Sequence, residues 1–487
     1  MKNTSIKKNY LLQSVYYILN LFLSLMTSPL ITRRLGDTAL GTYTYVSSVT
    51  YYFTLIANLG ILRYGQRVIS IARKDPDKLR KTFWSLYRCH FLVSITSVVL
   101  YALFIFLFIK VDQLIYWINL VFVISSIFDL TWLFYGLEDF SVVIIVNLIE
   151  RLIILIGILF FVHTPQDLWI YTLLETGILL MGNLCLMVRA KRVVPFIQTE
   201  YTDCITHLKP LLILSGSMFA VAIYTVFDKT LLGLLSTKEN VAYYEYSNKI
   251  INIPKNFISI ICSVIYPRAC DLANRGDIEG QKKYSNLAFY LVCTFGFASI
   301  FGLIAIANPF SILYFGESFA LCGDIIKAMT PLILLIGLGE VLRSIFLIPM
   351  NNDRLYLFMT LSSACISLVV SYFLISLMGV FGTIIGKIAA ETCFLILLLL
   401  FFGKYTDKKN LCKMIFLFFL IGLLMYLLIT ILPLDSVSLL RTVFLKTAIG
   451  AFIYILLAIF GTRFFFKDIW SLFYSFVHDE LLYKLKK

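Results

Sequence analysis

The sequence has little of what a soluble enzyme needs. Charged residues make up only 14% of its 487 positions, and it contains four histidines. The ten cysteines form no Cys-x-x-Cys pair, so their spacing indicates neither a zinc site nor a disulfide framework. The histidines show no metal-ligand spacing, and no loop presents a pair of catalytic carboxylates. We therefore expect no metal, no cofactor and no enzymatic activity.

Long apolar runs dominate the chain instead. Hydrophobic residues account for 60% of the positions, and the mean hydropathy is +0.88. Runs of about 18 or more apolar residues are typical of transmembrane helices. We predict an all-α integral membrane protein with about 14 transmembrane helices, at residues 10–32, 40–62, 83–109, 113–135, 141–162, 168–189, 208–235, 241–267, 285–310, 325–350, 355–377, 379–402, 411–432 and 439–461.

Lysine and arginine are distributed unevenly between the predicted loops. The outer loops hold only Arg33, Arg34, Lys110 and Lys238, and the other loop lysines and arginines lie on the opposite side. Basic loops face the cytoplasm. We therefore expect a multi-pass membrane protein with both termini in the cytoplasm. This asymmetry accounts for most of the net charge of +14, so the expected partner is the bilayer and not nucleic acid.

Two stretches about two hundred residues apart resemble each other. In residues 29–67 an apolar helix ends, a turn follows at Leu35-Gly36, and a second helix starts near Tyr43. Residues 228–260 have the same order, which predicts a turn at Leu232-Gly233 and a restart near Tyr244. A helix pair that recurs in both halves of a membrane protein predicts a pseudo-symmetric bundle with its site between the halves.

The repeat divides the chain into three predicted parts. Residues 1–196 form an N-terminal six-helix bundle, and residues 197–402 form a C-terminal six-helix bundle that begins with an entry linker. Residues 403–487 hold two extra transmembrane helices and a basic cytoplasmic tail. The charged segment 271–284 is expected to lie as an amphipathic piece on the membrane surface.

Polar side chains recur at helical spacing inside four predicted spans. In span 241–267 the spacing of three and four residues places the polar side chains within about 80° of one another. They are Glu245, Lys249, Asn252, Asn256, Ser259 and Ser263. The first span shows the same spacing in Gln13, Tyr17, Asn20, Ser24 and Thr27. The second span has a weaker stripe of Thr44, Ser48, Tyr51 and Asn58, and the seventh has one of Ser217, Tyr224 and Asp228. A polar stripe along a whole span predicts a hydrated cavity, and interhelical hydrogen bonding is the alternative.

Two further pairs of intramembrane charges stand one helical turn apart. Glu340 and Arg343 are three residues apart, and Lys387 and Glu391 are four apart. Each pair is expected to neutralise itself. Lys255 lies off the stripe of span 241–267, next to Pro254, which frees a backbone carbonyl inside the membrane.

Five segments carry a resemblance to a known family. They are LITRRLGDTALGTY from Leu30, FDLTWLFYGLEDF from Phe128, DKTLLGLL from Asp228, YPRACDLANRGD from Tyr266 and FLIPMNNDRLY from Phe346. Together they resemble the polysaccharide flippases of the Wzx/RfbX type. These flippases belong to the superfamily that also holds multidrug extruders and the lipid II flippase.

The resemblance implies two six-helix bundles that open alternately to the two sides of the membrane. Spans one, two, seven and eight would line the cavity, and these are the spans that carry the polar stripes. The implied substrate is an oligosaccharide linked to polyprenyl pyrophosphate, and polysaccharide polymerase machinery is an implied partner. Arg33 matches the first arginine of the Arg-x-Leu-Gly turn of the family, and Asp228 and Lys229 match the Asp-Lys of span seven.

We therefore expect a flippase of the bacterial cytoplasmic membrane. It would carry lipid-linked oligosaccharide repeat units across this membrane for cell-surface polysaccharide synthesis. The candidate substrate-binding residues are Lys249, Asn252, Asn256, Lys255, Arg33, Lys229 and Asn20. The candidate ion-coupling residues are Asp228, Glu245 and Glu340.

Two other functions compete with this hypothesis. A drug or metabolite cation antiporter of the same superfamily would favour acidic residues in its cavity, whereas the central stripe here contains a lysine. A membrane polysaccharide polymerase or glycosyltransferase would present a large outer loop with catalytic residues. The longest predicted outer loop, residues 311–324, is short.

Overall fold

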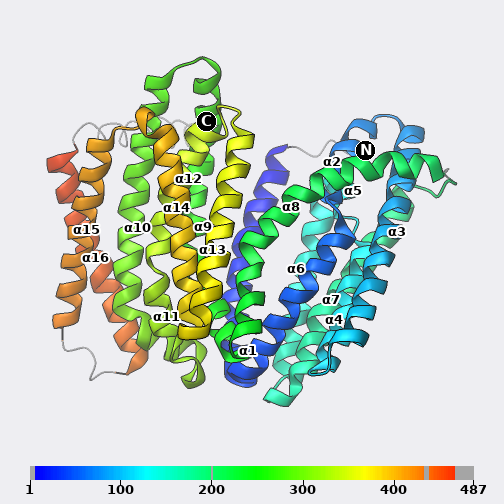
Figure 1. Cartoon of the computed structure of the whole chain (residues 1–487), viewed down its shortest axis with the longest axis horizontal. Coiled ribbons are helices and arrows are strands. Elements are labelled where there is room, and N and C mark those ends of the chain that lie inside the picture. The colour runs from blue at the N-terminus through cyan, green and yellow to red at the C-terminus, as the bar shows by residue number, and fades with distance from the viewer. Residues whose placement is uncertain (1–5, 199–200, 433–437, 467–487) are drawn as a thin grey trace. The chain divides into compact units, whose positions relative to one another are not determined.

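The protein is described here by a computed structural model that covers residues 6–198, 201–432 and 438–466 (Figure 1). Within these residues every regular element is a helix. The contacts divide the chain into two compact units, and the boundary along the chain falls between Gly233 and Leu234. The all-α membrane fold predicted from the apolar runs is therefore confirmed.

Unit 1 contains the helices up to α8. They are α1 (Ile6–Asn58), α2 (Ile61–Ala72), α3 (Pro76–Phe108), α4 (Gln113–Ser125), η1 (Ser126–Phe128), α5 (Thr131–Gly136), α6 (Phe140–Phe161), η2 (Pro165–Asp167), α7 (Leu168–Val193) and α8 (Tyr201–Leu235). Helix α1 packs against α3, α4 and α6, and α7 packs against α4 and α6. The short helices α2 and α5 lie together at one end of the unit (Figure 1).

Unit 2 contains the remaining helices. They are α9 (Lys238–Asn274), α10 (Ile278–Phe315), η3 (Glu317–Phe319), α11 (Cys322–Met329), α12 (Pro331–Leu342), η4 (Arg343–Leu347), α13 (Asp353–Met378), α14 (Val380–Phe402), η5 (Gly403–Tyr405), α15 (Lys408–Ile431) and α16 (Leu439–Phe465). Helix α10 is central because it packs against α9, α11, α12, α15 and α16.

Helix α1 is broken at the first predicted turn. Gly36 has φ 73° and ψ −178°, a backbone conformation that is almost restricted to glycine. A Cβ atom added at Gly36 would meet nothing within 4 Å. The backbone conformation, rather than a lack of space, therefore explains why glycine stands at this position.

The second predicted turn is wrong by a few residues. Gly233 lies inside α8, which continues to Leu235, and the break falls at Ser236 and Thr237. Thr237 precedes α9 in an extended conformation, with φ −84° and ψ 159°. Glycine was read as a turn signal, but at Gly233 an added Cβ would lie 2.2 Å from Cδ2 of Tyr45. This glycine thus permits close packing of α8 on α1.

The described residues contain 11 helices that are long and apolar enough to cross a membrane. The number becomes 12 if the bent pair Glu317–Met329 and Pro331–Leu347, which meet at 42°, counts as one span. This count takes 19–72 as a single helix although Gly36 breaks it. The exact number of 14 remains a prediction.

The predicted amphipathic piece at residues 271–284 is not a separate element. Helix α9 runs to Asn274, and α10 begins at Ile278 after a turn at Gly276 with φ 68°. Asp277 caps α10 by accepting a hydrogen bond from the backbone N–H of Gly280 at 2.8 Å. The charges of this segment therefore belong to two helix ends. Helix α2, which follows the predicted span 40–62, is amphipathic instead.

Helix α8 is tied to unit 1 at both ends. Near its start, His207 Nδ1 lies 2.9 Å from the hydroxyl of Tyr64 on α2, and His207 Nε2 lies 3.0 Å from the hydroxyl of Ser85 on α3. Near its end, Gly233 packs on Tyr45. The compact units therefore include α8 in unit 1, whereas the repeat predicted a boundary at residue 196. The three-part division remains a prediction.

Candidate functional site

The polar stripe of α9 lies on the less buried side of this helix. Lys249, Asn256, Ser259 and Ser263 are exposed, and Glu245 and Asn252 are half-buried. The opposite face is buried and consists mainly of apolar side chains, which include Ile250, Ile251, Ile258, Cys262 and Ile265. A helix in an apolar environment would bury its polar face, so the exposed stripe indicates contact with water or with a polar ligand.

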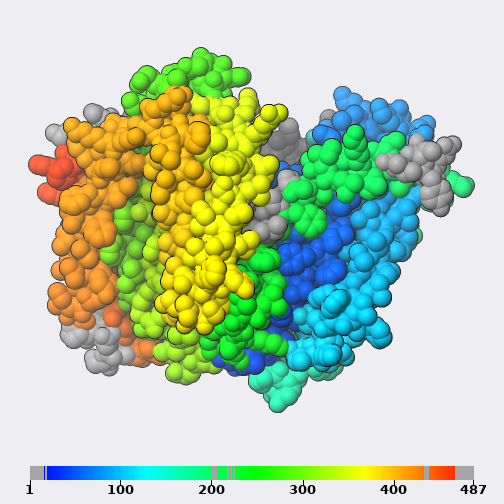
Figure 2. Space-filling model, viewed as in Figure 1, coloured from blue at the N-terminus to red at the C-terminus, as the bar shows by residue number. Residues whose placement is uncertain are grey.

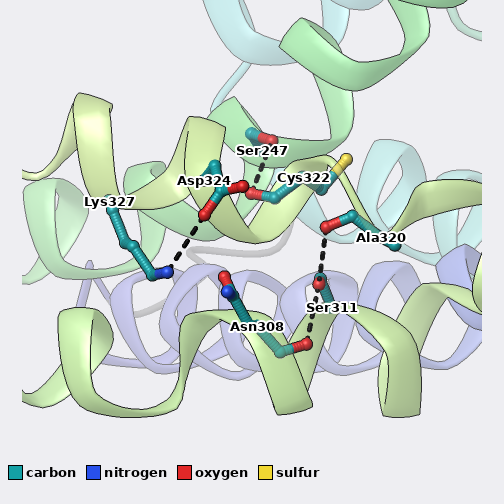
Figure 3. A network of polar contacts seen from close by, with 7 residues as sticks. All are labelled: Ser247, Asn308, Ser311, Ala320, Cys322, Asp324 and Lys327. Carbon is teal, nitrogen blue, oxygen red and sulfur yellow. Dashed lines mark hydrogen bonds and ion pairs between the residues drawn. The ribbon is translucent and has the colours of Figure 1, made fainter.

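A polar network fixes the buried face of α9 (Figure 3). The hydroxyl of Ser247 donates to the carbonyl oxygen of Cys322 at 3.5 Å, and the Cys322 thiol donates to the carbonyl oxygen of Tyr243 at 3.7 Å. The hydroxyl of Ser311 in α10 lies 2.9 Å from the carbonyl oxygen of Asn308 and 3.3 Å from that of Ala320. These contacts join α9, α10 and α11, and so they set the rotation of α9 that exposes the stripe.

Lys249 also lies over an aromatic ring. Its ammonium nitrogen is 4.3 Å from the centroid of the Tyr246 ring, which itself packs against Phe315 and Phe319 with centroid distances of 5.7 and 5.3 Å. The ring stabilises the cation through its electron-rich face. Because Tyr246 is buried, Lys249 has a fixed support near the start of the stripe.

Lys255 lies in a different electrostatic environment from Lys249. It is half-buried, and both Lys387 and Glu391 of α14 act on it electrostatically. Glu391 is buried, whereas Lys387 is half-buried. The predicted pair Lys387 and Glu391 is therefore part of a group of three charges. The sequence offered no signal for this because α9 and α14 are far apart in the chain.

The other predicted pair is confirmed. Arg343 forms an ion pair with Glu340, and its Nη1 donates to the hydroxyl of Tyr356 at 3.3 Å. The hydroxyl of Ser344 donates to Glu340 Oε1 at 3.4 Å. Glu340 thus accepts hydrogen bonds from two side chains of its own segment. This pairing makes it the weakest of the three candidates for ion coupling.

In unit 1 the polar residues of α1 and α8 are bonded to each other. The hydroxyl of Thr230 lies 3.1 Å from that of Ser48 and 3.1 Å from that of Tyr52. Asp228 is buried and acts electrostatically on Tyr52. The structure therefore places Ser48 and Asp228, one predicted residue from each of these two spans, in a group with Tyr52 and Thr230.

The remaining site candidates of unit 1 are not part of this group. Arg33 is exposed, and its neighbour Arg34 donates to the carbonyl oxygens of Ile158 and Val162, both at 2.8 Å, at the end of α6. Lys229 is half-buried. Asn20 Oδ1 is buried and has no hydrogen-bond partner within the described residues. The side chains of Gln13, Tyr17, Ser217 and Tyr224 lie outside the described part of the chain.

Unit 1 also contains a second polar cluster, which the stripes did not reveal. His90 Nε2 donates to the carbonyl oxygen of Ser126 at 2.8 Å, and Asn183 Nδ2 donates to that of Ser125 at 3.1 Å. Glu150 lies so close to α7 that a Cβ at Gly182 would be 1.5 Å from its Oε1. The signal available in the sequence was the charge of Glu150 itself, since ionisable residues inside membranes are rare.

The described residues contain no group of three or more histidine, cysteine, aspartate or glutamate side chains that could hold a metal ion. The arrangement is instead one of amides, hydroxyls and lysines on apolar helices. Such groups bind an anion or a sugar by hydrogen bonds and charge, without forming a covalent bond to it.

Residues 6–272, from α1 into the last turn of α9, match the polysaccharide biosynthesis protein family. The match covers more than half of the chain and includes every candidate site residue except Glu340. The chain belongs to this family.

Two relatives agree with this family membership. A candidate O-antigen transporter of Shigella dysenteriae is 23% identical over 403 residues, which cover 81% of this chain and 99% of the relative. A candidate O-antigen transporter of Escherichia coli strain K12 is 21% identical over 416 residues, which cover 82% of this chain and 96% of the relative. The similarity to both therefore extends well beyond the part that defines the family.

Solved structures show which fold this family member has. The lipid II flippase MurJ in an inward closed conformation superimposes with a TM-score of 0.75 at 16% identity, over 92% of this chain and 98% of that one. An inward-facing multidrug transporter of the MATE family gives a TM-score of 0.57 at 13% identity, over 80% of this chain and 94% of that one. The fold is therefore that of the transporter superfamily named by the sequence resemblance.

Proposed function

We propose that this chain is a flippase that carries oligosaccharide repeat units, linked to polyprenyl pyrophosphate, across the cytoplasmic membrane for cell-surface polysaccharide synthesis. The observation that carries the proposal is the exposed stripe of α9, with Lys249 supported by Tyr246. The family and the transporter names of both relatives support this class of function and give no support to an enzyme.

The chemistry of the stripe suits this substrate. A pyrophosphate with several sugars cannot enter hydrocarbon unassisted, because each polar group would lose its hydrogen bonds to water. Lys249 supplies a positive charge, and the amides of Asn252 and Asn256 supply donors at successive turns of α9. A lysine suits a moving phosphate because its ammonium does not impose the fixed two-point geometry of arginine.

The other candidate residues are proposed to bind substrate as well. Lys255 would provide a second charge on α9, and within unit 1 Arg33, Lys229 and Asn20 would provide polar groups. We propose that the two six-helix bundles open alternately to the two sides of the membrane, while the prenyl tail remains in lipid. We also propose that both termini lie in the cytoplasm and that polysaccharide polymerase machinery is the downstream partner.

Two driving forces are compatible with this site. An inside-negative membrane potential favours outward movement of an anionic head group by about 2.3 kcal/mol per charge at 100 mV. Proton or sodium coupling would use Asp228 or Glu245. Glu340 is less suited because Arg343 already pairs with it.

A cation antiporter is the second candidate because the MATE transporter shares the fold. A cavity that selects cations would place carboxylates along its polar surface. The exposed part of the α9 stripe carries Lys249, two serines and an asparagine, and its carboxylate, Glu245, is half-buried. The anionic substrate therefore fits this surface better.

The test is surface polysaccharide export by cells that depend on this protein. We expect Lys249→Ala to reduce export by on the order of tenfold or more, the loss expected for a hydrogen bond to a charged group, while the protein remains folded in the membrane. Lys249→Arg should keep partial export, and Glu245→Gln should be tolerated better than Lys249→Ala. Lys327→Ala is the matched control, since this lysine pairs with Asp324 at 3.0 Å, away from the stripe.

Normal export by Lys249→Ala would overturn the proposed phosphate role. So would export that is lost in Lys249→Ala and restored in the double variant Glu245→Ala/Lys249→Ala, because Lys249 would then only balance Glu245. An equal loss in Lys327→Ala would show that export responds to any lost surface charge.

A further inference from the structure

Helix α2 divides cleanly into a buried face and a basic face. Ile61, Tyr64, Gly65, Ile69 and Ala72 are buried. At 100° per residue the opposite face carries Arg63, Arg67 and Ser70, all of which are exposed. Leu62 and Ile71 flank this face on either side and are 40% and 67% exposed. The apolar face of α2 therefore serves packing within unit 1, and the basic face with Leu62 and Ile71 is the surface that remains exposed.

The orientation of α2 is fixed by its packing. Ile61, Tyr64 and Ile69 belong to a buried cluster that includes Phe83 of α3 and Trp132 of α5. The Tyr64 hydroxyl is also bonded to His207 of α8 at 2.9 Å. Because three neighbouring helices hold the buried face, the basic face cannot turn inward.

The charge around α2 is positive and largely uncompensated. The segment from Ile61 to Lys74 contains four basic residues and no acidic one. Arg73 forms an ion pair with Glu138 of another segment at 2.7 Å, whereas Arg63, Arg67 and Lys74 are exposed. The nearest acids along the chain are engaged, since Asp75 caps α3 and Asp77 lies 3.7 Å from Arg80.

In the space-filling view, the segment that holds α2 and the start of α3 forms an open surface at the upper end of unit 1 (Figure 2). A partner for this surface must be anionic and must also accept the apolar side chains of Leu62 and Ile71. A membrane interface offers both, because phosphate head groups lie directly above the acyl chains.

We propose that α2 binds the head groups of anionic phospholipids at the cytoplasmic face of the membrane. Arg63, Arg67 and Lys74 contact the phosphates, and Leu62 and Ile71 enter the boundary between head groups and acyl chains. The argument for this occupant is charge complementarity together with the exposed apolar side chains. The side of the membrane rests on the proposed orientation of the chain, but the lipid contact does not rest on the proposed substrate.

The test is a titration of the purified full-length protein in detergent with phosphatidylglycerol or phosphatidylcholine, followed by native mass spectrometry. We expect Arg63→Gln/Arg67→Gln to weaken phosphatidylglycerol binding by about 30-fold, from roughly 1 kcal/mol for each basic residue near the surface. The matched control is Lys191→Gln/Arg192→Gln, which removes two exposed basic residues from the end of α7. Arg63→Lys/Arg67→Lys keeps the charge and should bind nearly as the parent does.

Three results would overturn the proposal. They are equal losses in the α2 and α7 variants, unchanged binding in the α2 variant, and equal binding of phosphatidylcholine and phosphatidylglycerol by the parent. Full displacement of phosphatidylglycerol by a polyprenyl pyrophosphate would assign the surface to the transported lipid instead. Thermal unfolding without added lipid shows whether each variant is folded, and an additional Leu62→Ser/Ile71→Ser variant tests the apolar contact without removing charge.

Discussion

The two copies of the predicted repeat form their turns in different ways. Helix α1 breaks at one glycine, Gly36, in a conformation that other residues rarely adopt. Helices α8 and α9 are separated by Ser236 and Thr237, and Thr237 is in an extended conformation that any residue can adopt. The two turns therefore have different sequence requirements although the repeat makes them look equivalent.

The polar side chains of the two copies also differ in what they contact. Ser48 and Tyr52 of α1 are bonded to Thr230 of α8 within unit 1. On α9 the side chains of Lys249, Asn256 and Ser259 are exposed. The first group contributes to the packing of α8 on α1, whereas the second lies on the less buried side of α9, where we propose that the substrate binds. Helical spacing alone does not distinguish these two cases, because it shows which side chains share a face but not what covers that face.

The largest effect is expected where α8 packs on α1. Gly233→Leu should lower the free energy of unfolding by about 3 kcal/mol, because the new side chain must displace the ring of Tyr45. Thermal unfolding in detergent measures this loss. Gly216→Leu on the same helix is the control, since a Cβ there meets nothing within 4 Å. If Tyr45→Ala does not recover part of the loss in Gly233→Leu, the proposed clash is not its cause.

The next effect separates the two turns. Gly36→Ala should cost about 2 kcal/mol, since alanine must adopt a positive φ, whereas Thr237→Ala should stay within about 0.5 kcal/mol of the parent. Unfolding curves of both variants, recorded in the same detergent, provide the comparison. Equal costs at the two turns would contradict the conclusion that only the first depends on glycine.

A smaller effect is expected to distinguish the hydrogen-bonded group around Thr230 from the polar stripe of α9. Thr230→Val should cost about 1 kcal/mol, because the hydroxyls of Ser48 and Tyr52 lose their shared partner. Asn256→Val should leave stability nearly unchanged and reduce polysaccharide export. Measuring stability and export for both variants sharpens the comparison. A destabilised Asn256 variant would place this residue among the packing contacts.

The smallest effect concerns the anchoring of α9. Ser247→Ala removes a 3.5 Å hydrogen bond to Cys322 and should cost about 0.5 kcal/mol, at the low end for a single bond. We expect only a small loss of polysaccharide export, because the remaining contacts of α9 still hold the stripe in its orientation. A loss of export as large as that of Lys249→Ala, with unchanged stability, would mean that the buried face of α9 contributes directly to transport.

The sequence predicted the helices well, because an apolar run of that length has few alternatives to a membrane helix. It missed α2, whose 12 residues are too few to span a membrane and whose arginines resembled those of a basic loop. It predicted a turn at Gly233, because glycine is common both in turns and where helices pack closely. In each case the missing information was which residues lie next to the segment in space.

The candidate site was predicted only in part, because the sequence does not show which helices lie next to each other. The position of the stripe on the less buried side of α9 and the pairing of Glu340 with Arg343 follow from helical spacing, and the structure shows both arrangements. The assignment of the stripe residues to a binding site remains a prediction. The proximity of Lys255 to Lys387 and Glu391 depends on how α9 packs near α14. The bond between His207 and Tyr64 depends on the fold of unit 1 in the same way.

The two hydrogen bonds of His207 have a consequence for how the chain is divided. The predicted duplication makes α8 the first helix of the second copy, but Tyr64 and Ser85 hold it to helices of the first. The border predicted from the repeat, near residue 196, therefore differs from the border between the two compact units, which follows Gly233. In a chimera that exchanges halves between relatives, we expect the contacts of His207 with Tyr64 and Ser85 to be kept only if the junction follows α8, at Ser236 and Thr237.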